Sequence, residues 1–444
     1  MIHLGWFLGN GFGIQPWNEK GGDGPWVGSN VTDWMKPDIY VDLATSMERA
    51  GFDYILIEDT AMVEDSYHGT AETSLRRGFM APKNDPMPLV PLMTQRTKHI
   101  GIIPTASVIQ YPPYLAARLF TTLDHLTEGR VGLNVVTSVT DRVAQNYGYA
   151  EHFEHDERYR MAQEWVEVVQ QLQGTWAPDA VLADLENGVY ADHTKVQPID
   201  FVGKYFSSRG PLNTIPGPQG RTPIASAGGS PAGRDLAARY DDTMMSLCKS
   251  VEEMKEYRLD MRRRVAAYGR DPDAVKFLFL VTPVIAETDA EAQQKKKHIL
   301  ASKASDASIE YNLWNMSYTS GGRIDFGAID PDTLIRDIDF SRQNGENSSV
   351  AAIFQNSADK TLRQVVASSF QITDLGLVGS PDTVAAKMGD IMDEVAGDGF
   401  LFYLPTTRRN MAEVADGLAP ALRRRGLIRD GYSGTTLREN LLEN

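Results

Sequence analysis

The chain has 444 residues, 42% of them hydrophobic, and this length can bury a large core either as one elaborated barrel or as two ordinary domains. It carries 44 Lys and Arg residues against 59 Asp and Glu residues, and a net charge of -15 repels nucleic-acid phosphates and anionic lipid surfaces. These numbers exclude nucleic acid and membrane as partners, and because neither a signal peptide nor a long apolar run is found we expect a cytoplasmic protein.

Short apolar runs alternate with longer stretches of helical period, as expected when each strand of a parallel sheet is followed by a covering helix. The predicted strands are His3–Leu8, Tyr54–Glu58, Ile100–Val108, Val131–Thr137, Pro223–Ala227, Thr243–Leu247, Lys276–Ile285 and Phe400–Leu404. The predicted helices include Asp38–Ala50, Pro113–Leu126, Arg158–Leu172, Arg234–Tyr240, Glu252–Tyr268 and Pro381–Val395. Since eight such strands close a barrel, we predict an α/β protein with a (β/α)8 TIM barrel in one domain over residues 1–444.

Three segments interrupt the alternation, at about 60–86, 177–220 and 288–375. Their Gly, Pro and aromatic content is typical of insertions on a barrel rather than of linkers between domains. Loops that follow the C-terminal ends of barrel strands build the ligand site. We therefore expect these insertions to form walls and a lid at the C-terminal mouth.

Several common motifs are absent from the sequence. It contains no G-x-G-x-x-G after a strand, no G-x-x-x-x-G-K-[ST], no H-E-x-x-H and no C-x-x-C, so a Rossmann site, a P-loop and the commonest zinc sites have no support. His152 and His155 are three residues apart and could hold a metal, but the spacing offers no third ligand. We predict no metal site, and a metal-dependent hydrolase would require a stoichiometric bound ion.

A glycine-rich segment over Ser226–Arg234 directly follows one predicted strand and precedes a helix. Backbone N–H groups at such a helix start, together with the Ser230 hydroxyl, are placed to hold a phosphate. An ordinary glycine-rich turn with Ser230 as N-cap explains the segment equally well.

Four polar residues are candidates for ligand contacts. Asp59 comes directly after the second strand, although a solvated or capping carboxylate is the simpler interpretation. Asn134 lies in an apolar strand, where its amide needs partners from a polar heterocycle or from neighbouring strands. His155 and Tyr159 are four apart on one helical face and either reach into the mouth together or belong to a charged, surface-packed helix start. Around the first strand, the aromatic residues Phe7, Phe12 and Trp17 are candidates to line a substrate pocket.

Several sequence segments together resemble the bacterial luciferase-like superfamily, in the branch that contains nitrilotriacetate, EDTA and dibenzothiophene-sulfone monooxygenases and long-chain alkane monooxygenase. The segments that carry this resemblance, in family-like order and separation, are Val63–Tyr67, Tyr111–Tyr114 with Ala117–Arg118, Thr122–Thr127 with Gly129–Arg130, Asn134–Ser138 and Glu154–Tyr159. The resemblance covers most of the chain. The chain departs from the family pattern in two places: the segment Gln15–Asn30 differs from it, and Ser226–Gly228 stands where members often have Gln-Ala-Gly.

The resemblance implies a barrel that binds FMN at its C-terminal mouth, and it implies a role for each candidate. The implied residues are Asp59, Ser107 and Asn134 near the flavin ring, His155 and Tyr159 at the flavin chain or phosphate, and Gly229 and Ser230 in the phosphate loop. His155 is also the candidate proton partner in catalysis. Because the oxidant resides on the flavin, no catalytic triad or carboxylate pair is needed.

The implied activity is that of a two-component monooxygenase. A separate NAD(P)H-using flavin reductase would supply reduced FMN, which with O2 oxygenates a small organic substrate, and a homo-oligomer is expected by analogy. Members of the branch act on aminocarboxylates, sulfur heterocycles, alkanes and halogenated aromatics, so the fold does not select the substrate. Two alternatives stay open: a deazaflavin-dependent oxidoreductase, which would work without oxygen, and a non-catalytic flavin-binding protein, which would leave flavin oxidation rates unchanged.

Overall fold

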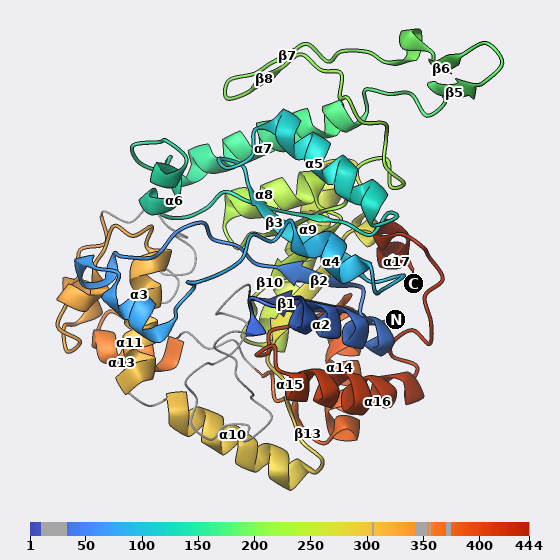
Figure 1. The fold of residues 1–444 in the computed structure, drawn as a ribbon. Coiled ribbons are helices and arrows are strands. Elements are labelled where there is room, and N and C mark those ends of the chain that lie inside the picture. The colour runs from blue at the N-terminus through green and yellow to red at the C-terminus, as the bar shows by residue number, and fades with distance from the viewer. Residues whose placement is uncertain (10–32, 304–305, 342–353, 355–356, 370–373, 444) are drawn as a thin grey trace.

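A closed barrel of eight parallel strands forms the centre of the structure, a computed structural model that describes residues 1–9, 33–303, 306–341, 354, 357–369 and 374–443 (Figure 1). Its strands are β1 (His3–Leu8), β2 (Tyr54–Ile57), β3 (Gly101–Ser107), β4 (Leu133–Val136), β9 (Ile224–Ala227), β10 (Thr243–Ser246), β11 (Lys276–Val281) and β14 (Gly399–Phe402). They follow the order β1-β14-β11-β10-β9-β4-β3-β2, and β1 pairs with β2 to close the barrel. The predicted fold class is confirmed, because all eight predicted strands are present.

One predicted strand, Lys276–Ile285, is interrupted. The first part is the barrel strand β11, whereas β12 (Val284–Ile285) leaves the barrel and pairs with β13 (Val378–Gly379) in a separate two-stranded sheet. Pro283 stands at the break, and because proline cannot donate to a ladder it ends the pairing there.

Helices cover the outside of the barrel (Figure 1). They are α2 (Pro37–Ala50), α4 (Leu89–Thr94), α5 (Pro113–Leu126), α6 (Asp141–Asn146), α7 (His155–Gln173), α8 (Pro231–Tyr240), α9 (Val251–Ala267), α14 (Pro381–Val395), α15 (Arg408–Ala412) and α16 (Ala419–Arg424), whereas α17 (Leu437–Leu442) lies at one end of the barrel. Helix α5 and helix α14 have the predicted bounds. Helix α7 begins at His155, three residues before the predicted Arg158, because Asp156 and Glu157 favour the positive end of the helix dipole in its first turn.

The first and third insertions pack together beside the mouth as one lobe, which we call the mouth lobe (Figure 1). Its helices are α3 (Glu72–Arg77), α11 (Asp306–Thr319) and α13 (Leu362–Ser369), whereas α10 (Asp289–Lys303) packs on the β12–β13 sheet. Trp314 of α11 is fully buried and donates from its indole Nε1 to Ser74 Oγ of α3 over 2.7 Å. Both insertions follow the C-terminal ends of barrel strands, β2 and β11, which agrees with the expected position at the mouth.

The middle insertion departs from that expectation. Segment 177–220 joins the end of α7 to the start of β9, and a helix-to-strand connection begins and ends at the N-terminal face of a barrel. It forms two antiparallel hairpins, β5 (Val181–Asp184) with β6 (Val189–Ala191) and β7 (Phe201–Val202) with β8 (Ser207–Ser208), which extend beyond α7 and α5 in Figure 1. The prediction that this insertion lies at the mouth is wrong for its points of attachment, because composition marks an insertion without showing which end of the barrel carries it. Its second hairpin nevertheless runs back along α7, where Lys204 Nζ lies 2.6 Å from Glu157 Oε1 in the first helical turn.

Helix α17 seals the N-terminal end of the barrel. Leu437 and Leu441 lie in one buried cluster with the interior side chains of Tyr54 and Ile103. The fit is close, since a Cβ placed on Gly101 of β3 would lie 2.5 Å from Leu437 Cδ1. Ligands are therefore expected at the opposite, C-terminal end.

We expect Leu437→Ala to lower the free energy of unfolding by about 2–5 kcal/mol, because the truncated side chain would leave a cavity among rigid interior residues. The matched control is Leu442→Ala in the same helix, where the side chain is 46% exposed and a change within about 0.5 kcal/mol is expected. Denaturant unfolding followed by far-UV circular dichroism measures both. Equal effects of the two substitutions would contradict the sealing role.

Candidate active site

A chain of hydrogen bonds joins the end of strand β3 to the start of helix α7. Ser107, the last residue of β3, lies with its Oγ 2.7 Å from Ser138 Oγ, just after β4. Arg158 Nη1 of α7 donates to the Ser138 carbonyl oxygen over 2.5 Å. Ser138 has a φ of 59°, a left-handed conformation that turns its hydroxyl and carbonyl toward these partners. Ser107 and the first turn of α7 are thus held together at the mouth.

Asn134 is buried within β4, one strand from Thr105, its ladder partner on β3. Its Nδ2 donates to Thr105 Oγ1 over 2.7 Å, whereas its Oδ1 is buried without a hydrogen-bond partner in the protein. A buried amide oxygen left without a donor costs about 1–3 kcal/mol. The site therefore suits a ligand that presents an N–H or O–H group at this point.

His155 and Tyr159 lie on one face of α7, with ring centroids 5.0 Å apart. The His155 Nδ1 atom is 2.8 Å from Asp156 Oδ1, which fixes the ring, and the Nε2 atom is buried without a partner in the protein. This nitrogen is a second polar atom that a bound ligand would satisfy.

The glycine-rich segment before α8 packs against Tyr159. Ser230 is the N-cap of α8, and its Oγ accepts from the Gly233 N–H at 3.1 Å. A Cβ on Gly233 would lie 2.8 Å from Gly228 Cα and 3.0 Å from the Tyr159 hydroxyl oxygen, so only glycine permits this approach. The structure thus brings the predicted pair on α7 next to the segment that contains Gly229 and Ser230.

Asp59 lies just beyond the end of β2, partly buried and close to other charges. Burial, opposed by Lys83 and assisted by the carboxylates of Glu58 and Asp85, raises the pKa of its carboxyl to about 7. Asp59 therefore changes its charge near neutral pH, which its sequence position alone did not indicate.

Phe7 is the predicted substrate residue that the structure describes. Its ring packs edge-to-face on Tyr403, which directly follows β14, with centroids 5.4 Å apart. Phe12 and Trp17, predicted with it, lie outside the described residues.

Sequence reasoning missed Ser138, Gly233, Tyr403 and the ion pair of Glu58 with Lys83. Ser138 and Gly233 stand inside the motifs quoted above, so their neighbours were the available signal. Glu58 is two residues beyond an inward-facing position of β2, and the strand's alternation could have placed it in the mouth.

His152 and His155, which the sequence offered as possible metal ligands, do not form a metal site among the described residues. His152 uses both ring nitrogens, since Nε2 is 2.9 Å from the Thr137 carbonyl oxygen and Nδ1 accepts from the Phe153 N–H at 3.1 Å. Within the described ranges, no group of three or more His, Cys, Asp or Glu residues could hold a metal ion. Over the same residues, every helix is too short or too polar to cross a membrane.

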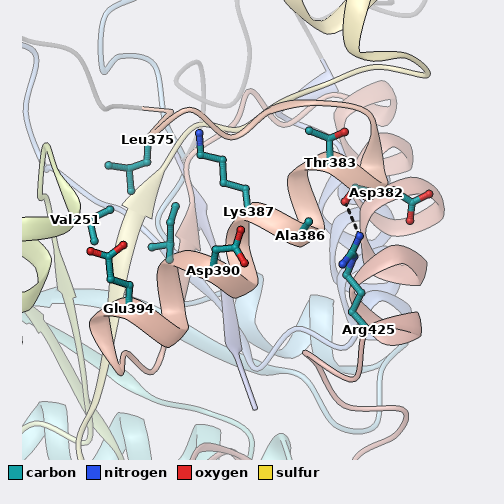
Figure 2. A pocket seen from close by; sticks show the side chains of 10 residues that line it. Val251, Leu375, Asp382, Thr383, Ala386, Lys387, Asp390, Glu394 and Arg425 are labelled. Carbon is teal, nitrogen blue, oxygen red and sulfur yellow. Dashed lines mark hydrogen bonds between the residues drawn. The ribbon is translucent and has the colours of Figure 1, made fainter.

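A cavity of about 590 Å³ lies on the outer surface of the barrel, between α14 and the start of α9. Figure 2 shows Lys387, Asp390 and Glu394 projecting from α14 around it, with Val251 opposite. It shares no lining residue with the mouth, so it is not the candidate active site.

Comparisons with known proteins agree with this geometry. The model of the luciferase-like monooxygenase family matches residues 4–399. Dimethyl-sulfide monooxygenase of Hyphomicrobium sulfonivorans is 35% identical over 91% of this chain and 83% of its own length, and dibenzothiophene-sulfone monooxygenase of Rhodococcus erythropolis (strain XP) is 34% identical over 99% and 96%. The crystal structure of a riboflavin lyase with modified FMN and riboflavin superimposes with a TM-score of 0.86 at 28% identity, over 100% of this chain and 96% of the lyase.

The barrel and its mouth therefore define a TIM-barrel enzyme with a candidate ligand site at the C-terminal ends of the strands. The chain belongs to the luciferase-like monooxygenase family and is a monooxygenase, as the resemblance implied.

The raised pKa of Asp59 leads to a prediction for Asp59→Asn. A buried carboxyl with a raised pKa is tolerated while protonated, and its cost appears as pH rises from about 4 through 7. The variant lacks this cost, so its gain in unfolding free energy over wild type should be larger at pH 8 than at pH 5. After a discount for solvent screening, the difference is about 1–2 kcal/mol. Denaturant unfolding at both pH values measures it, and an equal effect at pH 5 and pH 8 would refute the raised pKa.

Proposed function

We propose that this monooxygenase is the oxygenating component of a two-component system that uses reduced FMN, supplied by a separate NAD(P)H:flavin reductase, and O2. The observation that carries the proposal is the pair of buried polar atoms without partners, Asn134 Oδ1 and His155 Nε2, on either side of the hydrogen-bonded chain through Ser138. A ligand with several hydrogen-bonding groups, such as a flavin, would satisfy both. The similar riboflavin lyase was crystallised with a modified FMN, which supports this choice.

Each residue then has a role that follows from its position. The helix dipole of α8 and the backbone N–H groups at Gly229 and Ser230 would hold the phosphate. The Ser230 Oγ accepts from Gly233, which leaves its O–H to donate to a phosphate oxygen. Tyr159, packed against Gly233, would border the phosphate or the ribityl chain.

The flavin ring would lie between Asp59, Ser107 and Asn134, with Asn134 Oδ1 accepting from a ring N–H. When bound, reduced FMN supplies the two electrons that activate O2. His155 would hold or move a proton at its Nε2 atom, because Asp156 occupies Nδ1. The protein contributes by orienting the substrate and excluding water.

The substrate class is a small organic molecule, and sulfur compounds are the first candidates. The two relatives described above are named for dimethyl sulfide and dibenzothiophene sulfone, and each covers at least 91% of this chain. Phe7 and Tyr403 offer aromatic surface at the mouth for such a molecule.

Anaerobic titration of the purified protein with reduced FMN, followed by mixing with O2 while the absorbance spectrum is recorded, tests the proposal. We expect saturable binding of reduced FMN and a rate of flavin oxidation that differs from that of free reduced FMN. A protein that binds FMN without changing its oxidation rate would be a storage protein. Absence of binding to reduced FMN, with binding of a reduced deazaflavin, would overturn the proposal in favour of the deazaflavin enzyme.

Gly233→Ala is expected to weaken reduced-FMN binding at least tenfold in the same titration, because the added methyl group meets Gly228 and the Tyr159 hydroxyl. The substitution lies within α8, where alanine favours the helix, so folding should be preserved. Gly431→Ala is the matched control, since a Cβ there meets no atom within 4 Å and binding should stay within twofold. Unchanged binding in Gly233→Ala would remove the phosphate loop from the proposed site.

A further inference from the structure

An ion pair lies at the C-terminal end of β2, in the mouth of the barrel. Tyr54 and Leu56 of β2 belong to the interior cluster, and the Glu58 N–H donates to the Leu8 carbonyl oxygen over 3.0 Å, which extends the ladder one residue beyond the strand. Strand alternation therefore directs the Glu58 side chain inward. Lys83 Nζ, from the first insertion, lies 2.9 Å from both Glu58 carboxylate oxygens.

This pair is poorly solvated and its cation is already neutralised. The Lys83 side chain is 8% exposed and the Glu58 side chain 23% exposed. Because the Glu58 carboxylate offsets the positive charge of Lys83, the attraction of Lys83 for a further anion is weak. The charges that act on Asp59 are Lys83 against Glu58 and Asp85, one cation against two anions.

Three aromatic rings lie near the ion pair in the mouth. Phe7 and Tyr403 pack edge-to-face. Tyr403 and Tyr311, which belongs to α11 in the mouth lobe, both lie close enough to Glu58 for its carboxylate to act on their phenol groups. Burial and the Glu58 carboxylate raise the pKa of Tyr311 and of Tyr403, so both phenols are neutral at physiological pH. Each of the two tyrosine residues is nevertheless 38% exposed, as expected for residues that border an accessible space.

From these contacts we propose that the mouth selects uncharged substrates with aryl or alkyl groups and rejects anions, and that Glu58 and Lys83 determine this selectivity. The inference rests on the proposed function, because it concerns the substrate of the same site. An anionic substrate would lose its hydration in the mouth, and the carboxylates of Glu58, Asp59 and Asp85 would disfavour it. The Lys83 charge, already paired with Glu58, would not compensate this cost. An uncharged molecule loses little on desolvation and gains contact with the rings of Phe7, Tyr311 and Tyr403.

The test uses two probes that share the methylthio end and differ at the far end, where one carries a carboxylate and the other its uncharged methyl ester: 4-(methylthio)benzoate and methyl 4-(methylthio)benzoate. In either, the sulfur lone pair would bond one atom of O2, the O–O bond would break, and the other atom would leave as water with two protons. Reduced FMN supplies the two electrons and is released as oxidised FMN. The sulfoxide formed under 18O2, measured by mass spectrometry with reductase and NAD(P)H present, gives kcat/KM for each probe.

We expect wild type to prefer the ester at least tenfold. Glu58→Gln keeps the side-chain shape but frees the Lys83 charge, so the ester-to-carboxylate ratio should fall at least tenfold. Combining Glu58→Gln with Lys83→Met removes both charges and should restore the preference. Should Glu58→Gln fail to fold, Lys83→Met alone gives the opposite expectation, a ratio above that of wild type, because the carboxylate is then uncompensated.

Different results would overturn the selectivity and the proposed function. Equal use of both probes, a ratio unaffected by Glu58→Gln, or no oxygenation of the ester by a protein that binds and oxidises reduced FMN would overturn the selectivity. A protein that does not bind reduced FMN at all would instead overturn the proposed function. Reduced-FMN binding is therefore measured on the same samples.

Discussion

Closure of the eight-stranded barrel is the constraint from which the rest of the structure follows. Because β1 pairs with both β2 and β14, no strand of the barrel is free to slip, and the alternation of each strand fixes which side chains face inside. The same closure brings all the C-terminal strand ends to one mouth. With α17 filling the opposite end, residues as distant in sequence as Phe7 and Tyr403 become neighbours around a single site.

The mouth is organised by polar contacts between elements rather than by its loops alone. Ser138 connects β3 to α7, Tyr159 carries the contact on to Gly233, and Ser230 caps the helix that follows. These contacts hold the proposed flavin side of the mouth in place before any ligand arrives, which lowers the entropy lost on binding. The ion pair of Glu58 with Lys83 joins the end of β2 to the first insertion on another side of the mouth.

The sequence predicted the barrel well because buried parallel strands are runs of branched residues and because Gly and Pro mark helix ends, as at α5 and α14. It could not place segment 177–220, since composition does not show to which barrel face an insertion belongs. The candidate residues on β3, β4, α7 and α8 converge as their strand and helix positions suggested. The Glu58 partner could not be found, because Lys83 lies in an insertion with no regular period. The raised pKa of Asp59 comes mainly from burial, which a sequence position does not show.

The pairing of β1 with β14 has a consequence for how the chain is made. His3 is the ladder partner of Gly399, so one edge of the first strand stays unpaired until nearly four hundred residues have left the ribosome. An open apolar strand edge invites pairing with other chains, and long-range pairing of this kind is slow to form. During synthesis the nascent chain is therefore expected to depend on chaperones, and overproduction should favour aggregates made of chains whose barrels never closed.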